Sequence, residues 1–346
     1  MKNFSKIVRK NIQDLAPYSS ARDEFEGLNG VFLDANENPF QSAVNRYPDP
    51  YQKELKKIIS KYKGVNENQL IVGNGSDEIL DLIVRATCEP NKDKAVAITP
   101  SYGMYKVICN TNAVDLTEVP LNESFDIDKT ALLKESEGAK LIFLCSPNNP
   151  TGNLLNRKTI IEICENFEGI VVVDEAYIDF SNGKTLLTEL NSLDNLFVCQ
   201  TLSKAYGLAG IRVGMGFGSP KLIDVLNKIK PPYNVNELSQ KFAIARLKDM
   251  KTVSSEVMQI LLERSRVLEE MMRIPAVLKI YRTDANFILF KVDNADKLYN
   301  YFIKNKVIIR NRTNLPGCKN CLRVTIGKSD ENNRFIEVLK TYENQN

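Results

Sequence analysis

Histidine is absent from the 346-residue chain, and so is tryptophan. The lack of histidine excludes a Ser-His-Asp triad, a Cys-His pair and every metal site that has an imidazole ligand. Any proton transfer must therefore use lysine, a carboxylate, tyrosine or cysteine. Apolar runs fall short of the roughly 18 residues of a membrane span. The basic N-terminus also lacks the apolar core of a secretory signal.

Cysteine and charge limit the function further. The seven cysteines are scattered, and only Cys318 and Cys321 form a CxxC pair. Without a second pair or a histidine, this pair cannot complete a four-ligand zinc site, so we expect no metal. Lysine and arginine total 46 against 43 acidic residues, which argues against nucleic acid as a partner. We expect a reduced, soluble, cytoplasmic protein with no membrane partner.

Short apolar runs alternate with helical patterns over the first 220 residues. The runs LIFLC and IVVVD show no polar alternation, which indicates strands buried on both faces of a mostly parallel sheet. Helical spacing at residues 77–88 and 158–166 places helices between strands, so the predicted fold class is α/β. Strands are predicted at residues 70–73, 95–99, 140–145, 170–174, 196–201 and 212–217.

The pattern changes after a long helix predicted at residues 252–272. Shorter strands and helices follow, which indicates a small α+β domain. The strands are predicted at 286–290, 307–310 and 322–326, and the helices at 295–305 and 332–342. The length suggests about two domains. We expect an N-terminal segment packed on the small domain (1–30), a large ligand-binding α/β domain (31–250) and an interdomain helix with the small domain (251–346).

Four motifs lie where predicted strands end. GNGSDE (73–78) opens a helix, whose free N–H groups and partial positive charge suit an anion. SPNNPTG (146–152) presents Asn149 from a proline-rich loop, and Asp174 ends an apolar strand, where a carboxylate is costly to bury without a cation. Lys204 follows another buried strand, with Arg212 eight residues later. Each motif alone is consistent with an ordinary turn, cap or solvated side chain. Their shared position at carboxyl ends of strands favours one ligand site.

Pyridoxal phosphate is a ligand that requires these groups together. It has an aldehyde for a lysine, a phosphate for a helix N-terminus and an arginine, and a ring nitrogen for a carboxylate. A desolvated lysine has a lowered pKa and is therefore a nucleophile toward carbonyls. A carboxylate about 4 Å from the ring nitrogen contributes roughly 4 kcal/mol at an effective dielectric near 20, enough to keep that nitrogen protonated. No histidine is required.

Together these segments resemble the fold type I enzymes that use pyridoxal phosphate, which share the aspartate aminotransferase fold. Within them the chain is most similar to the histidinol-phosphate aminotransferase family. The resemblance implies a mostly parallel central sheet covered by helices in a large domain, plus a small α+β domain. The matching motifs are LDANENP (33–39), NRYPDP (45–50), GNGSDE, PSYGMY (100–105), SPNNPTG, VVDEAYIDF (172–180), TLSKAYGLAGIRVG (201–214), DANFILF (284–290) and CLRVTIG (321–327).

The resemblance also implies residue roles. Lys204 would bond to the cofactor aldehyde and carry protons, Asp174 would face the ring nitrogen, and Tyr177 would contact the ring 3-hydroxyl. Cofactor binding would further involve Gly75, Ser76, Asp77, Tyr102, Asn149, Thr201, Ser203, Arg212 and, across a homodimer interface, Tyr47. Arg323 would anchor the anionic group of the substrate, and the other substrate contacts would be Arg310, Tyr18 and Asn36.

The implied reaction is transamination between L-histidinol phosphate and 2-oxoglutarate, giving imidazole-acetol phosphate and L-glutamate in histidine biosynthesis. A threonine-phosphate decarboxylase of cobalamin synthesis shares most of these motifs and remains an alternative, as does an aromatic amino-acid aminotransferase of the same fold. A non-enzymatic regulator on this fold would need a binding appendage, and the motifs span nearly the whole chain. Residues 311–320 match no motif of the family.

Overall fold

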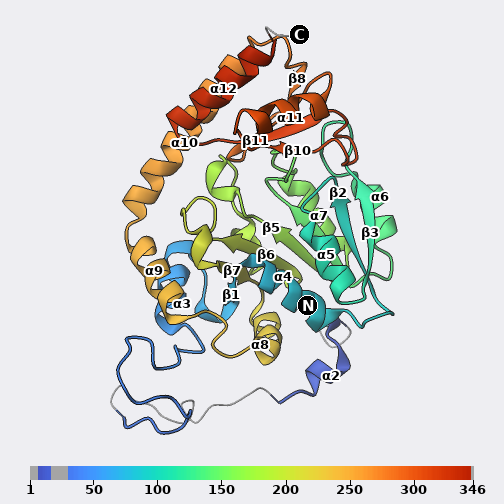
Figure 1. The fold of residues 1–346 in the computed structure, drawn as a ribbon. Helices are drawn as coiled ribbons and strands as arrows, with labels where there is room; N and C mark the ends of the chain where they lie inside the picture. The colour runs from blue at the N-terminus through green and yellow to red at the C-terminus, as the bar shows by residue number, and fades with distance from the viewer. Residues whose placement is uncertain (1–6, 17–29, 344–346) are drawn as a thin grey trace.

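The computed structural model describes residues 7–16 and 30–343. A large α/β domain surrounds a central sheet, and the C-terminal elements, orange and red in Figure 1, form a smaller α+β layer against it. The predicted α/β fold class is confirmed, including the mostly parallel central sheet covered by helices.

Within residues 7–16 and 30–343, seven strands form the central sheet, in the order β1-β7-β6-β5-β4-β2-β3. All neighbours from β6 to β3 pair in parallel, whereas β7 is antiparallel to both β6 and β1. All six predicted strands are present, and β3 was missed because its sequence DLTEVP is largely polar and partly exposed. The strands are β1 Leu70–Asn74, β2 Lys94–Thr99, β3 Asp115–Pro120, β4 Leu141–Cys145, β5 Ile170–Asp174, β6 Leu196–Thr201 and β7 Val213–Phe217.

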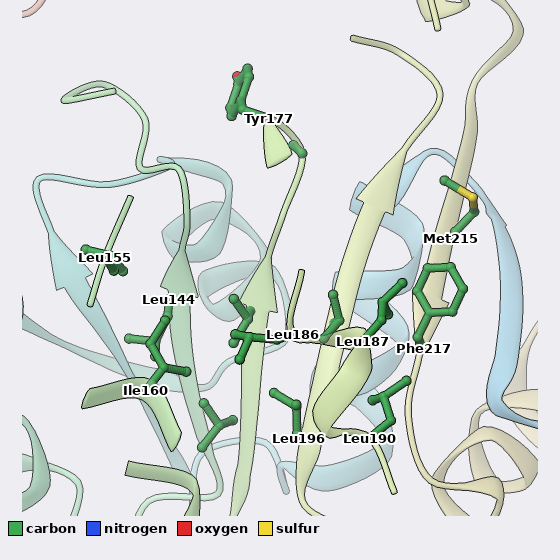
Figure 2. Close-up of a cluster of buried hydrophobic side chains, with 14 of the residues drawn as sticks. Leu144, Leu155, Ile160, Tyr177, Leu186, Leu187, Leu190, Leu196, Met215 and Phe217 are labelled. Carbon is green, nitrogen blue, oxygen red and sulfur yellow. The ribbon is translucent and has the colours of Figure 1, made fainter. Parts of the chain in front are cut away.

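Strand β4 shows why its sequence lacks polar alternation. Ile142 and Leu144 enter the hydrophobic core on one face of the sheet, and Phe143 and Cys145 enter the core on the other face. Figure 2 shows part of the first core, in which Leu144, Leu196, Met215 and Phe217 lie near leucines of the short helix η4 (Leu186–Glu189). Full burial of such a side chain contributes roughly 1.5–3 kcal/mol to folding.

Helices cover both faces of this sheet. Helix α4 follows β1 and packs on β1 and β7, so its first turn lies at the carboxyl edge of the sheet. The large-domain helices are α3 Lys53–Lys63, α4 Ser76–Thr87, α5 Met104–Thr111, α6 Lys129–Glu135, α7 Arg157–Asn166, α8 Pro220–Ile229 and α9 Glu237–Lys248.

The C-terminal region has its own antiparallel sheet, in the order β10-β11-β9-β8. Its core contains Met271, Phe290, Phe302 and Phe335, and the last two rings stack with centroids 5.3 Å apart. The strand predicted at 307–310 is wrong for its first three residues, because pairing begins only at Arg310. The elements are α10 Met250–Met271, β8 Lys279–Ile280, β9 Phe287–Lys291, α11 Ala295–Lys304, β10 Arg310–Asn311, β11 Cys321–Thr325 and α12 Ser329–Glu343.

The N-terminal segment does not pack where the sequence predicted. Within residues 7–16, Arg9 bonds through its backbone N–H to the Ala86 carbonyl and through its guanidinium to Glu89, both at the end of α4. The short helix α2 (Lys10–Gln13) packs on α8. The prediction that residues 1–30 pack on the small domain is therefore wrong for this part, whose apolar Ile7 and Ile12 are buried on the large domain.

Two further findings concern the whole described chain. All seven cysteines are buried and free. No helix within residues 7–16 and 30–343 is both long enough and apolar enough to cross a membrane.

Candidate active site

A pocket opens at the carboxyl ends of β4, β5 and β6, where ligand sites of parallel sheets form. Ten of the twelve residues predicted to bind a cofactor line this pocket. An eleventh, Gly75, lies beside the lining residue Arg212. The twelfth, Tyr47, lies elsewhere. The lining residues are Ser76, Asp77, Tyr102, Cys145, Asn149, Asp174, Ala176, Tyr177, Thr201, Ser203, Lys204 and Arg212.

Asp174 ends strand β5 and is almost fully buried. Its Oδ1 accepts a hydrogen bond from the Ala176 backbone N–H at 3.0 Å, and its Oδ2 accepts one from the Tyr105 hydroxyl at 3.1 Å. Burial raises the pKa of this carboxyl to about 6, although both hydrogen bonds oppose the shift. In the part of the chain that the structure describes, no cation lies within ion-pair distance of Asp174, so its charge is available to a cationic ligand.

Lys204 reaches into the same pocket, with its Nζ 5.7 Å from the centroid of the Tyr177 ring. Partial burial lowers its pKa, and the positive charge of Arg323 lowers it further. Lys204 as a whole is exposed in this chain, while the surrounding pocket still desolvates its amine enough to lower the pKa. The lowered pKa nevertheless increases the share of neutral, nucleophilic amine.

The first turn of α4 forms a cradle with Arg212. Gly75 precedes the helix with a φ of +82°, and a Cβ there would lie 2.5 Å from the Arg212 guanidinium. Arg212 itself has a φ of +54°, a strained backbone conformation for a side chain of this size. Its guanidinium lies 3.6 Å from the Asp77 carboxylate and 3.4 Å from the Ser203 hydroxyl. Free helix N–H groups and an arginine side by side form an anion site.

Gly214 of β7 permits this arrangement. A Cβ at this position would overlap the backbone of Gly75 and the amide nitrogen of Ser76. The absence of a side chain thus lets the start of α4 lie directly on the strand. This role of Gly214 leaves no pattern in the sequence, because it depends on the packing of two distant segments.

Two tyrosines and an amide line the other side of the pocket. The Tyr102 hydroxyl donates to Asp77 at 3.1 Å, and its ring meets Tyr105 edge-on. The Asn149 amide donates to the Tyr177 hydroxyl at 3.3 Å, and its oxygen accepts a hydrogen bond from Arg323. Burial raises the pKa of both Tyr102 and Tyr177, so both are protonated at neutral pH. Asn149 therefore joins the large-domain pocket to the small-domain sheet.

Two residues that do not line the pocket but lie next to its residues were not predicted from the sequence. Tyr105 lies inside the PSYGMY motif that was quoted, and only the rotation of α5 reveals that its hydroxyl meets Asp174. Arg312 belongs to the segment that matched no motif, and it follows strand β10 beside Arg323. Asn148, by contrast, points away from the pocket, since its side chain bonds Ser101 and Thr151 within the loops.

Two of the predicted site residues, Asn36 and Tyr47, lie apart from the pocket of their own chain. Tyr18 lies outside the described residues. Asn36 and Tyr47 belong to the segment of residues 30–52, drawn in blue in Figure 1, which extends away from the central sheet. Tyr47 stacks on Tyr233 with ring centroids 4.5 Å apart and is half exposed. A role of Asn36 or Tyr47 in a site would therefore require another chain.

The chain matches the family described as aminotransferase class I and II over residues 31–339. It belongs to this family. Its similarity to the histidinol-phosphate aminotransferase of Flavobacterium johnsoniae is 51% identity over 342 residues, covering 98% of each chain. The crystal structure of the histidinol-phosphate aminotransferase from Clostridium acetobutylicum superposes with a TM-score of 0.81 at 26% identity, covering 88% of this chain and 92% of the other. The enzyme from Sinorhizobium meliloti in complex with pyridoxal-5′-phosphate has a TM-score of 0.80 at 22% identity, covering 87% and 83%.

Enzymes of this family depend on pyridoxal phosphate, so this aminotransferase has that cofactor. The pocket fits it in three observable ways. A buried carboxylate lacks a cation, an amine with a lowered pKa faces it across the pocket, and two glycines keep a cradle of helix N–H groups open beside Arg212.

Proposed function

We propose that this aminotransferase transfers the amino group of L-histidinol phosphate to 2-oxoglutarate, giving imidazole-acetol phosphate and L-glutamate in histidine biosynthesis. The observation that carries the proposal is the position of Arg323, which donates a hydrogen bond to the pocket residue Asn149 and lies opposite Arg310 in the β10–β11 pair. A pocket for amine chemistry thus adjoins a strongly cationic surface suited to a substrate with a phosphate group. The 51% identity to a relative of that name supports the same substrate.

Bound pyridoxal phosphate supplies an aldehyde carbon for the substrate amine and an electron-withdrawing ring that stabilises negative charge at the substrate Cα. In our proposal, Lys204 would hold the cofactor at that aldehyde carbon. The same Nζ, when free, would be the base that takes the proton from the substrate Cα and the acid that gives it back. The lowered pKa of Lys204 favours the neutral form that accepts this proton.

Other pocket residues hold the cofactor in this scheme. Asp174 places its negative charge at the ring nitrogen, and Tyr177 with Asn149 binds the ring 3-hydroxyl. Tyr102 covers one ring face. The phosphate contacts are Gly75, Ser76, Asp77, Thr201, Ser203 and Arg212, which surround the first turn of α4.

Arg323 anchors the anionic group of the substrate in this proposal, with Arg310 as a second cation. Arg323 is placed by its hydrogen bond to Asn149 and by the Phe287 ring, 5.1 Å from its guanidinium carbon. Asn36 and Tyr18 complete the substrate contacts.

We also propose a homodimer in which Tyr47 reaches the cofactor phosphate of the partner chain. Its segment carries an unusual number of exposed apolar side chains, a feature of protein interfaces. They are Val31, Leu33, Phe40, Val44, Tyr47 and Tyr51. The proposal includes the division into residues 31–250 and 251–346, and a location in the cytoplasm, where seven free thiols stay reduced.

A half-reaction screen tests this function. Holoenzyme is mixed separately with histidinol phosphate, threonine phosphate, L-glutamate and aromatic amino acids, and the visible absorbance of the cofactor is followed. We expect conversion to the pyridoxamine form with histidinol phosphate and with glutamate. Release of carbon dioxide from threonine phosphate would instead identify the decarboxylase, and a response to aromatic amino acids alone would identify an aromatic aminotransferase. Reduction with borohydride should leave the cofactor covalently attached to Lys204.

A further inference from the structure

Three arginines lie on one face of the small-domain sheet. Arg310 and Arg323 are directly opposite in the antiparallel register of β10 and β11, so their side chains share a face. Arg312 is two residues beyond Arg310, and its backbone N–H donates to the Cys321 carbonyl at 2.9 Å, which continues the ladder. Because side chains alternate along a strand, Arg312 returns to the face of Arg310.

This arrangement is unfavourable without an anion. Like charges directly opposite each other destabilise a strand pair. Burial, followed by the charges of Arg323 and Arg310, lowers the pKa of Arg312 to about 10. None of the three arginines forms an ion pair with a carboxylate of residues 7–16 or 30–343.

Part of this cluster is also unpaired. The Nε atoms of Arg312 and Arg323 are buried without a hydrogen-bond partner among the described residues, and so is the hydroxyl of Thr313. Unsatisfied buried donors of this kind are rare unless a ligand completes them. The Arg323 guanidinium donates a hydrogen bond to Oδ1 of Asn149, which lines the pocket, so the cluster borders the pocket that contains Lys204.

We propose that Arg312 is a third cation of the substrate anion site and makes that site selective for a phosphate monoester over a carboxylate. The inference rests on the proposed function. A phosphate monoester carries nearly two negative charges near neutral pH and three acceptor oxygens, whereas a carboxylate of glutamate carries one charge and two oxygens. Arg310 and Arg323 suffice for the carboxylate, and the third arginine adds its interaction mainly to the dianion.

The test compares Arg312→Gln and Arg312→Lys with wild type in both half-reactions, at constant ionic strength and with the holoenzyme. For Arg312→Gln we expect kcat/KM for histidinol phosphate to fall roughly 10- to 100-fold, since a charged hydrogen bond is lost. The value for glutamate should fall less than about threefold. Arg312→Lys keeps the charge without the planar fork and should be intermediate. Arg273→Gln removes an exposed arginine of the same domain and controls for net charge.

A second measurement separates this inference from the proposed function. Inorganic phosphate should compete with glutamate in the wild-type half-reaction, and its inhibition constant should rise at least tenfold in Arg312→Gln. Equal losses for both amine substrates, or an unchanged inhibition constant, would overturn the role of Arg312. Failure of the wild-type enzyme to react with histidinol phosphate would instead reject the proposed function, while the phosphate competition would still report on the anion site.

Discussion

The Tyr105 hydroxyl donates a hydrogen bond to Oδ2 of Asp174, 3.1 Å away, inside the core of the large domain. Tyr105 is fixed by stacking on Phe143, with ring centroids 4.9 Å apart, and its edge meets the Tyr102 ring. The same residue therefore holds the carboxylate proposed for the ring nitrogen and supports the ring proposed to cover the cofactor. Its contact is indirect, so we regard Tyr105 as a positioning residue.

Tyr105→Phe should shift the pH dependence of cofactor binding. The hydrogen bond lowers the pKa of Asp174 against the effect of burial, and its removal should therefore raise that pKa. As the pH is lowered, the affinity of the apoenzyme for pyridoxal phosphate should then begin to fall at a higher pH than in wild type. Fluorescence titration at a series of pH values measures this affinity. Tyr301→Phe, on the remote helix α11, is the control. Identical pH profiles of cofactor affinity for Tyr105→Phe and wild type would show that the hydroxyl does not stabilise the ionised carboxylate of Asp174.

Asp174→Asn should stabilise the apoprotein while removing turnover. The folded pKa, raised from 3.8 to about 6 by burial, means that the ionised carboxylate opposes folding. This unfavourable contribution to the free energy of folding is absent below pH 4 and grows to about 3 kcal/mol as the pH rises through 6. In thermal melts, Asp174→Asn should therefore unfold at a higher temperature than wild-type apoprotein at pH 8, with the difference vanishing near pH 4. A lower melting temperature for Asp174→Asn than for wild-type apoprotein at pH 8 would show that the carboxylate of Asp174 is not a buried, unpaired charge.

The sequence predicted the site residues that follow directly from strand ends. Asp174, Asn149 and Lys204 meet because parallel strands end at one edge, and the apolar runs before them identify those strands. Tyr105 and Arg312 could not be predicted in this way. Their contacts depend on the rotation of α5 and on how the small-domain sheet docks, and neither leaves a periodic pattern in the sequence.

Gly214→Ala should weaken cofactor binding and lower the stability of the fold. The added methyl group overlaps the backbone of Gly75 and Ser76, so the first turn of α4 must move away from Arg212. We expect the dissociation constant of pyridoxal phosphate to rise by roughly one to two orders of magnitude, as one or more charged contacts are lost. Gly210→Ala is a matched control in the same region, because a Cβ there meets no atom within 4 Å. Equal affinity of both variants for pyridoxal phosphate would show that the cradle at the start of α4 does not bind the cofactor.

Lys204→Ala should bind pyridoxal phosphate noncovalently and still lose turnover. Asp174, Arg212 and the start of α4 remain to hold the cofactor, but no amine is left to move the proton between the substrate Cα and the cofactor C4′. General acid–base catalysis contributes about 10²–10⁴-fold, so the rate constant of the half-reaction in single-turnover measurements should drop by at least that factor. A small primary amine such as methylamine, added to the variant, should restore part of the rate in proportion to its concentration. Near-normal turnover without added amine would show that another group carries the proton.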